Sequence, residues 1–201
     1  MPEFHISVLG SGSSGNVTFL SDGSVNILID AGLSCREIER RLRTIGFESK
    51  NIDAVLLSHE HSDHTKGALR FCAKHSAKIF TTLGTHEGIS KISDKNVEWV
   101  RVYANSSMKI GKLLVDFFST PHDAADPVGF RIRRGKLAFG HVTDLGHISE
   151  DVVNGLRGCS SILIEANHDI DMLRNSSYPE SIRKRIGGRW GHLSNDAVAH
   201  Y

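Results

Sequence analysis

The sequence predicts an α+β protein in which two packed β-sheets carry helices on their outer faces. Strand-like segments first follow one another and then alternate with helix-like segments, and the second half of the chain repeats this style. Patterns of this kind are typical of layered sheets covered by helices. The chain has 201 residues and no linker-like stretch between its halves, so we expect one domain over residues 1–201.

The composition excludes several classes of protein. Hydrophobic residues make up 39% of the chain and charged residues 23%, which provides a core and excludes an intrinsically disordered chain. The longest apolar runs, at residues 54–57 and 162–164, fall far short of the ~20 residues that a membrane span needs. No secretory signal is visible, and we expect no membrane contact. The net charge of +1 argues neither for nor against a nucleic-acid partner.

Two residue counts point to the compartment and to the chemistry. The three scattered cysteines, Cys35, Cys72 and Cys159, fit a reducing cytoplasm better than a disulfide framework. We expect each of them to be a small buried apolar residue. The twelve histidines are many for a chain without a tag-like run, and they are the first indication of metal chemistry.

The first thirty residues predict three strands, over residues 4–9, 17–20 and 25–29. The glycine-rich segment 10–15 between the first two strands matches the dinucleotide-binding pattern G-x-G-x-x-G. That function needs a helix directly after the glycines. A β-type run follows here instead, so we expect a flexible hairpin loop.

The following segments alternate helices with strands. Ser34 and Glu37 form a capping-box pattern, which opens a helix that ends at Gly46. The near-continuous apolar run at residues 53–57 predicts a strand covered on both faces. The other elements expected in this half are a helix over residues 65–75, a strand over 78–81 and a weaker helix over 85–92.

The second half predicts strands over residues 97–103, 112–118, 129–133, 136–139 and 161–165. Residues 129–133 and 136–139 form a hairpin with Arg134 and Gly135 at its turn. Ser149 caps a helix that reaches residue 156, and Pro179 opens a short basic helix that reaches residue 186. Ser194 caps the last helix.

The segment 59–64 carries four side chains that bind metals, directly after a buried strand. His59 and His61 face the same direction in extended backbone and are able to share one metal ion. Asp63 and His64 fall in the turn that follows, where they can face a second ion. Imidazoles and carboxylates are the ligands that zinc, manganese and iron prefer. The zincin pattern H-E-x-x-H does not apply, because Asp63 stands at the position of the second histidine.

Further residues of the same kind follow other predicted strands or precede the last helix. Taken singly, a histidine or aspartate in a loop is more often structural or solvated. The repeated placement of such residues, just beyond a strand, favours a shared site. These residues are His122, Asp144, His168 and His192.

These motifs resemble the metallo-β-lactamase fold superfamily, and within it the YycJ (WalJ)-type branch. The resemblance spans the whole chain and rests on H-x-H-x-D-H at 59–64, SGSSGN at 11–16, HDA at 122–124, DPVGF at 126–130, TDLG at 143–146, EANHD at 165–169 and GHLSN at 191–195. It implies an αββα four-layer sandwich with two divalent metal ions at one edge, between the sheets. The ions implied are Zn²⁺ or Mn²⁺, with Fe²⁺ as a further candidate.

The resemblance also implies a role for each ligand. His59, His61 and His122 hold the first ion, whereas Asp63, His64 and His192 hold the second. Asp144 bridges the two ions and orients a hydroxide between them. His168 binds the substrate or transfers a proton. The expected catalytic residues are therefore Asp63, Asp144 and His168. Asp30 organises the ligand loop. His141 and His147 flank Asp144 without being ligands, and His5, His75, His86 and His200 are surface or packing residues.

The activity implied is hydrolysis of phosphodiester bonds, by a DNA exonuclease that acts in repair. The basic stretch 183–185 with Arg189 and Trp190 would contact DNA, unless it is a solvated helix face. A hydrolase of lactones, thioesters or cyclic phosphodiesters is the alternative, as is a metal-binding regulatory protein. The branch usually continues past GHLSN, so we expect this chain to be short at its C-terminal end and part of the substrate groove to be affected. A homodimer is compatible with the sequence.

Overall fold

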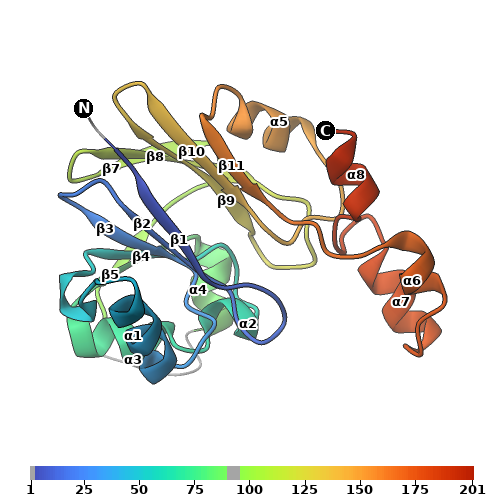
Figure 1. Ribbon diagram of the computed structural model, residues 1–201, viewed down its shortest axis with the longest axis horizontal. Coiled ribbons are helices and arrows are strands. Elements are labelled where there is room, and N and C mark those ends of the chain that lie inside the picture. Colours follow the sequence, from blue (N-terminus) through green and yellow to red (C-terminus); the bar gives the residue numbers. More distant parts are fainter. Residues whose placement is uncertain (1–2, 90–95) are drawn as a thin grey trace.

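The computed structural model describes residues 3–89 and 96–201 and shows two β-sheets packed face to face (Figure 1). In the described residues the first sheet has six strands in chain order: β1 (His5–Gly10), β2 (Val17–Ser21), β3 (Asn26–Ile29), β4 (Ala54–Leu56), β5 (Lys78–Thr81) and β6 (Trp99–Arg101). The second sheet there has five strands in the order β11-β10-β9-β8-β7: β7 (Ser106–Ile110), β8 (Leu113–Ser119), β9 (Val128–Arg134), β10 (Leu137–Val142) and β11 (Ser161–Ile164).

Strand direction changes within each sheet. Strands β1, β2 and β3 are antiparallel neighbours, whereas β3, β4, β5 and β6 run parallel to one another. In the second sheet β7 to β10 are antiparallel and β11 runs parallel to β10. Parallel strands need crossover connections. The helices α1 (Cys35–Thr44) and α3 (Ala68–His75) lie in two of the crossovers of the first sheet, and α5 (Glu150–Leu156) lies in the crossover of the second.

Three layers of apolar contacts give the predicted αββα order. Side chains such as Ile27 and Phe130 are fully buried between the two sheets. Ile38 of α1 and Phe71 of α3 pack on the outer face of the first sheet. Val152 of α5 packs on the outer face of the second. Strand β4 is buried on both of its faces, which is what the apolar run at residues 53–57 predicts.

The prediction of one helix over residues 65–75 is wrong. Two helices occupy this stretch, α2 (Ser62–Thr65) and α3, with a break at Gly67. The Gly67 N–H donates to the Ala31 carbonyl at 2.8 Å, and a Cβ on Gly67 would collide with the Leu33 carbonyl. This close approach, which only glycine allows, fixes the start of α3 against the loop that follows β3.

Other boundaries also differ from the expectation. Strand β7 and helix α6 (Ile170–Arg174) were not predicted, nor was the 3₁₀ turn Ser49–Asn51. Helix α4 (Leu83–Ile89) begins two residues before the predicted helix over 85–92. Residues 90–92 of that prediction lie outside the described residues. Cys35 and Cys72 are buried, whereas Cys159 is only partly so, which corrects the expectation for Cys159.

Two short helices form an arm beside the sandwich. Helices α6 and α7 (Glu180–Ile186) project from the end of the second sheet, and α8 (Asn195–Ala199) follows them (Figure 1). No residue of α6 or α7 is buried. The sequence missed α6 because its apolar side chains do not enter the core. Among the described residues, no helix is long and apolar enough to span a membrane.

Candidate metal centre

Most of the candidate ligands lie just beyond the carboxyl ends of strands. His59 and His61 follow β4, His122 follows β8, and Asp144 follows β10. The two packed sheets present these strand ends at one edge of the sandwich, and so side chains far apart in sequence meet there. Their arrangement falls into three groups of ligand atoms, in each of which all atoms lie within 4.8 Å of one another.

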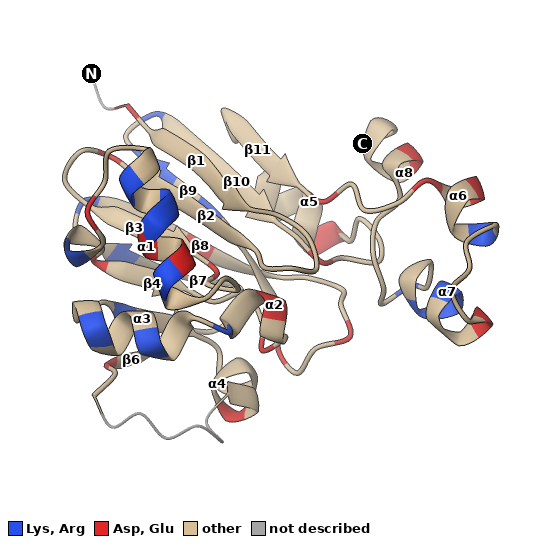
Figure 2. Cartoon of the chain, turned by 60° about the horizontal axis from the view of Figure 1, so that its bottom comes forward, with Lys and Arg blue, Asp and Glu red and all other residues tan. Residues whose placement is uncertain are grey.

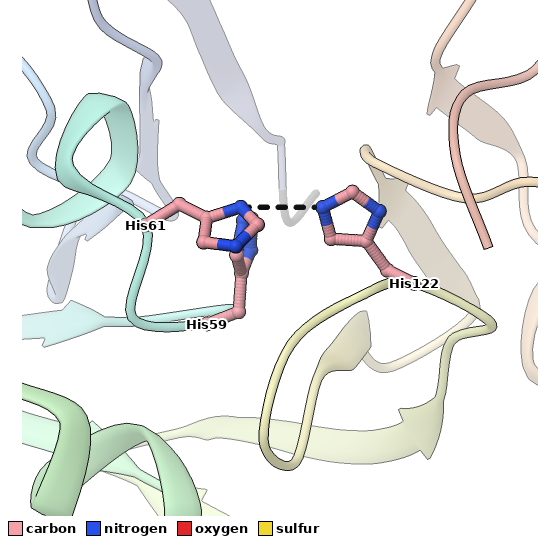
Figure 3. Close-up of side chains that lie close together, drawn as sticks. All are labelled: His59, His61 and His122. Atoms are coloured by element: carbon pink, nitrogen blue, oxygen red, sulfur yellow. Dashed lines mark hydrogen bonds between the residues drawn. The ribbon is translucent and has the colours of Figure 1, made fainter. Parts of the chain in front are cut away.

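The first group consists of three histidines that point toward one another (Figure 3). His122 Nε2 lies 3.3 Å from His61 Nδ1. His59 is almost fully buried, and its Nε2 has no hydrogen-bond partner. A buried polar atom without a partner is costly unless a water or an ion satisfies it. Because His59 Nε2 faces two further imidazoles, the group fits a divalent metal ion.

Outer hydrogen bonds orient two of these rings. Ser58 Oγ lies 2.9 Å from His59 Nδ1, and His122 Nδ1 donates to the Gly191 carbonyl at 3.1 Å. Metal-binding histidines usually hold their second nitrogen in this way, which fixes the tautomer and leaves the other nitrogen free to ligate. Burial, with some repulsion from His64, holds the pKa of His59 well below its usual value. His59 is therefore neutral, as a metal ligand must be.

The second group joins His59 to His64 and Asp144. His64 Nε2 lies 2.7 Å from Asp144 Oδ2, and His64 Nδ1 donates to Asp30 Oδ2 at 2.8 Å. Burial alone would lower the pKa of His64, but the two carboxylates raise it well above its usual value. In the absence of a metal, the protonated His64 ring therefore pairs with two buried carboxylates, Asp30 through Nδ1 and Asp144 through Nε2. Asp30 therefore contacts a candidate ligand directly, and its role in organising the ligand loop stays a prediction.

The third group contains Asp144, His192 and a residue that the sequence analysis did not select, Glu165. His192 Nδ1 lies 2.7 Å from Glu165 Oε1 and 3.1 Å from Asp144 Oδ1. Burial would lower the pKa of His192, yet these two carboxylates raise it to about 10. Glu165 directly follows β11, the same placement that singled out the other ligands. Of the two candidate side chains that follow β11, the sequence analysis selected His168 and not Glu165.

Asp144 belongs to both the second and the third group. Burial would raise the pKa of Asp144, but hydrogen bonds with His192 and His64 hold it well below its usual range. The Asp144 backbone has a positive φ of 54°, a region that non-glycine residues seldom adopt and that recurs at functional sites. A carboxylate shared by two ligand groups has the placement that a bridging ligand needs.

Asp63 and His168 lie near these groups but belong to none of them. Asp63 Oδ2 is 3.6 Å from His64 Nε2 and 3.3 Å from Asn16 Nδ2. His168 pairs with Ser194 in an isolated β-bridge, and its buried Nδ1 has no hydrogen-bond partner. Burial lowers the pKa of His168. Both side chains line the same pocket as Asp144.

The glycine-rich loop between β1 and β2 holds α2 in place. The Asn16 N–H donates to the Asp63 carbonyl at 2.7 Å, and Gly12 N–H donates to Asn16 Oδ1 at 2.9 Å. A Cβ on Gly32 would overlap the Asp63 carbonyl. The loop is the predicted hairpin connection between β1 and β2 rather than a nucleotide-binding loop. Its hydrogen bond to the Asp63 carbonyl fixes α2 at the edge where the other candidate ligands lie.

Two histidines beside Asp144 make other contacts. His141 is buried and its Nε2 lies 3.2 Å from Thr18 Oγ1, while burial lowers its pKa to about 4. His147 is hydrogen bonded through Nδ1 to the Arg189 carbonyl at 3.0 Å. Neither joins a ligand group.

A pocket of about 800 Å³ opens over the second and third groups. Asp63, Asp144 and His192 line it, together with Met172 of α6 and Tyr178 of the segment between α6 and α7. Both arm side chains are more than half exposed. The candidate metal centre thus opens toward the arm.

Comparison with known proteins identifies the family. The sequence model of the Beta-lactamase superfamily domain matches residues 25–201. The chain belongs to the metallo-β-lactamase superfamily. This metallo-β-lactamase-fold chain is 33% identical over 197 residues to exodeoxyribonuclease WalJ of Streptococcus pneumoniae, covering 96% of this chain and 73% of the relative. It is 30% identical over 197 residues to exodeoxyribonuclease YycJ of Bacillus anthracis, covering 97% and 75% respectively.

Solved structures show the same fold. Zn²⁺-bound PqqB from Methylobacterium extorquens superposes with a TM-score of 0.76 at 19% identity, covering 96% of this chain and 81% of PqqB. The metallo-β-lactamase fold protein YhfI from Bacillus subtilis gives 0.71 at 19% identity, covering 83% and 72%. The predicted fold is confirmed. This metallo-β-lactamase-fold protein is a hydrolase of a superfamily that binds divalent metal ions, and its three ligand groups fit them.

Proposed function

We propose that this chain is a metal-dependent DNA exonuclease that hydrolyses phosphodiester bonds with two divalent ions, Zn²⁺ or Mn²⁺. In this proposal His59, His61 and His122 hold one ion, Asp63, His64 and His192 hold the other, and Asp144 serves both. The observation that carries the proposal is Asp144, whose two oxygens contact His64 and His192 from different ligand groups. A shared carboxylate is what two neighbouring ions require.

The chain's own residues supply orientation and protons. Two bound cations provide Lewis-acid activation of water and neutralise charge on a phosphoryl oxygen. Asp144 orients the attacking water from its buried position. His168 faces the same pocket and donates a proton to the leaving oxygen, because an approaching phosphate anion raises the pKa that burial lowers. Asp63 is about one-third exposed and lines the pocket, from where it would hold the second ion.

Nucleic acid is the favoured substrate because of the relatives and the arm. Two relatives that align with nearly all of this chain are named exodeoxyribonucleases. Helix α7 carries Arg183, Lys184 and Arg185, and its last residue, Ile186, lines the pocket. The side chains of Lys184 and Arg185 are more than half exposed. Lys184 pairs with Glu180 and Arg185 with Asp123, but exposed pairs of this kind are weak and exchange readily with a phosphate.

The cysteines indicate the cellular compartment of the proposed activity. Three free cysteines fit a reducing compartment. We therefore place the enzyme in the cytoplasm, where an exonuclease of this type would serve DNA repair.

The test is degradation of 5′-labelled single- and double-stranded DNA by the purified chain with added Mn²⁺ or Zn²⁺. Asp63→Ala and His61→Ala remove ligands that are only partly buried, so the fold should survive both changes. His200→Asn changes an exposed histidine outside the centre and is the matched control. Metal-dependent loss of label in the native chain and in the control, but not in the two ligand variants, is the expected result.

Two other outcomes would replace the proposal. Cleavage of a small phosphodiester, lactone or thioester without cleavage of DNA would favour the alternative of a small-molecule hydrolase. Two bound metal ions without hydrolysis of any of these substrates would favour a metal-binding regulatory protein.

A further inference from the structure

A separate cluster of metal-binding side chains lies on the helical layer that covers the first sheet. Cys35 and Glu39 lie one turn apart on α1, and His75 is the last residue of α3. Their ligand atoms all lie within 4.8 Å of one another. The two helices run side by side on the outer face of the sheet (Figures 1 and 2), so the cluster is distinct from the centre at the sandwich edge.

We propose that Cys35, Glu39 and His75 form a third metal site, which takes one divalent ion of the zinc type. A thiolate, an imidazole and a carboxylate are a ligand set that zinc accepts. With zinc–ligand bonds of about 2.0–2.3 Å, tetrahedral ligand atoms lie roughly 3.3–3.6 Å apart. Cys35 Sγ lies 3.4 Å and His75 Nε2 lies 2.9 Å from the same oxygen, Glu39 Oε1. Small side-chain shifts therefore suffice for coordination.

The surroundings of the cluster suit an ion that enters from solvent. Cys35 is 6% exposed, while the side chains of Glu39 and His75 are 13% and 12% exposed. Glu39 and His75 also line an open pocket on this face. Three protein ligands leave the fourth position of a tetrahedral ion for a water molecule, and the opening gives access from solvent.

A lysine competes with the ion for one of the three ligands in the metal-free protein. Lys74 Nζ donates to Glu39 Oε1 at 2.7 Å, and its side chain is 57% exposed. Ion binding releases this ammonium group into solvent, where it loses little. The Cys35 S–H bond breaks as the Sγ–metal bond forms, and its proton passes to the buffer. Burial and the Glu39 carboxylate raise the pKa of Cys35 to about 11, so this proton is present before binding. The hydrogen that His75 Nε2 donates to Glu39 is lost to water while Nδ1 takes one up, so that Nε2 is free to bind the metal.

Cobalt distinguishes this site from the edge centre. The edge centre contains only histidine and carboxylate ligands, whereas a thiolate bound to Co²⁺ gives an intense charge-transfer absorption in the near ultraviolet. We would titrate the metal-depleted full chain with Co²⁺, and measure both this absorption and the cobalt bound at equilibrium. The expected result is the thiolate band together with one equivalent of cobalt beyond those of the edge centre.

Variants assign the band to this cluster. Cys35→Ser should abolish the band and remove one equivalent of cobalt, whereas Cys72→Ala and Cys159→Ser should retain both. His75→Gln should weaken binding by at least tenfold. Lys74→Met removes the competing ammonium group without touching a ligand, and it should tighten binding. A folding defect cannot mimic that gain.

The proposal fails if saturating Co²⁺ produces no thiolate band, or if the band survives Cys35→Ser. It also fails if Lys74→Met weakens the binding that gives the band. None of these readouts depends on hydrolysis, so the outcome is independent of the exonuclease proposal.

Discussion

Asp30 accepts a hydrogen bond from His64 Nδ1 at 2.8 Å, and both side chains are 0–1% exposed. Asp30 also accepts bonds from the backbone N–H and the hydroxyl of Ser58, both at 2.9 Å. Ser58 Oγ in turn contacts His59 Nδ1. One buried carboxylate thereby orients a candidate ligand directly and a second one through a serine.

Replacing Asp30 should weaken metal binding without removing a ligand. Asp30→Asn keeps the shape but removes the charge that holds His64, and loss of such an outer partner typically costs 10–100-fold in metal affinity. Competition with a chelator measures this change. Asp171→Asn, at a carboxylate whose side chain is 84% exposed, is the matched control. Equal affinities of the two variants would contradict the role of Asp30.

Glu165 should help to keep His192 protonated in the metal-free protein. Glu165→Gln removes one of the two carboxylates that raise the pKa of His192 to about 10, so this pKa should fall. NMR titration of the histidine rings measures the fall in the metal-free protein. Glu150→Gln, in the first turn of α5, serves as the control. An unchanged His192 titration would show that Asp144 alone holds the proton.

The benefit of bound metal should grow with pH. The pKa of His192 is raised in the folded, metal-free protein, so its protonation stabilises that state fully below the unfolded value of about 6.5. This stabilisation is lost as pH rises toward about 10. Metal binding must displace the same proton. The difference in unfolding temperature between zinc-loaded and chelator-treated protein should therefore widen from pH 7 to 9, and a constant difference would contradict the assignment.

Tyr178 should contribute to binding of single-stranded DNA if the pocket is the substrate site. It lines the pocket and is 55% exposed, and stacking of a base on an aromatic ring contributes about 1–3 kcal/mol. Tyr178→Ala should weaken binding of a labelled oligonucleotide accordingly. Tyr103→Ala changes a tyrosine that is 63% exposed but lies outside the pocket. Fluorescence anisotropy should separate the two variants, and equal losses would remove the pocket from the binding site.

Local patterns in the sequence were sufficient for the strands and for the first ligands. The alternation and the apolar runs gave β4 and its neighbours, because a strand buried on both faces needs continuous apolar side chains. The H-x-H spacing brought His59 and His61 together because alternate residues of extended backbone face one way. These conclusions depend on residues close in sequence, and the resemblance extended them to the αββα order.

Only the tertiary structure decided which distant side chains share a contact. Glu165 joined the centre because β11 pairs with β10 and carries its carboxylate to His192. The break between α2 and α3 required Gly67 to meet the loop after β3, and the cluster of Cys35, Glu39 and His75 required two helices to pack side by side. His75 was expected to be a surface or packing residue for this reason. These contacts join residues 27 or more positions apart. A local pattern in the sequence contains no information about which of such distant residues come together in the fold.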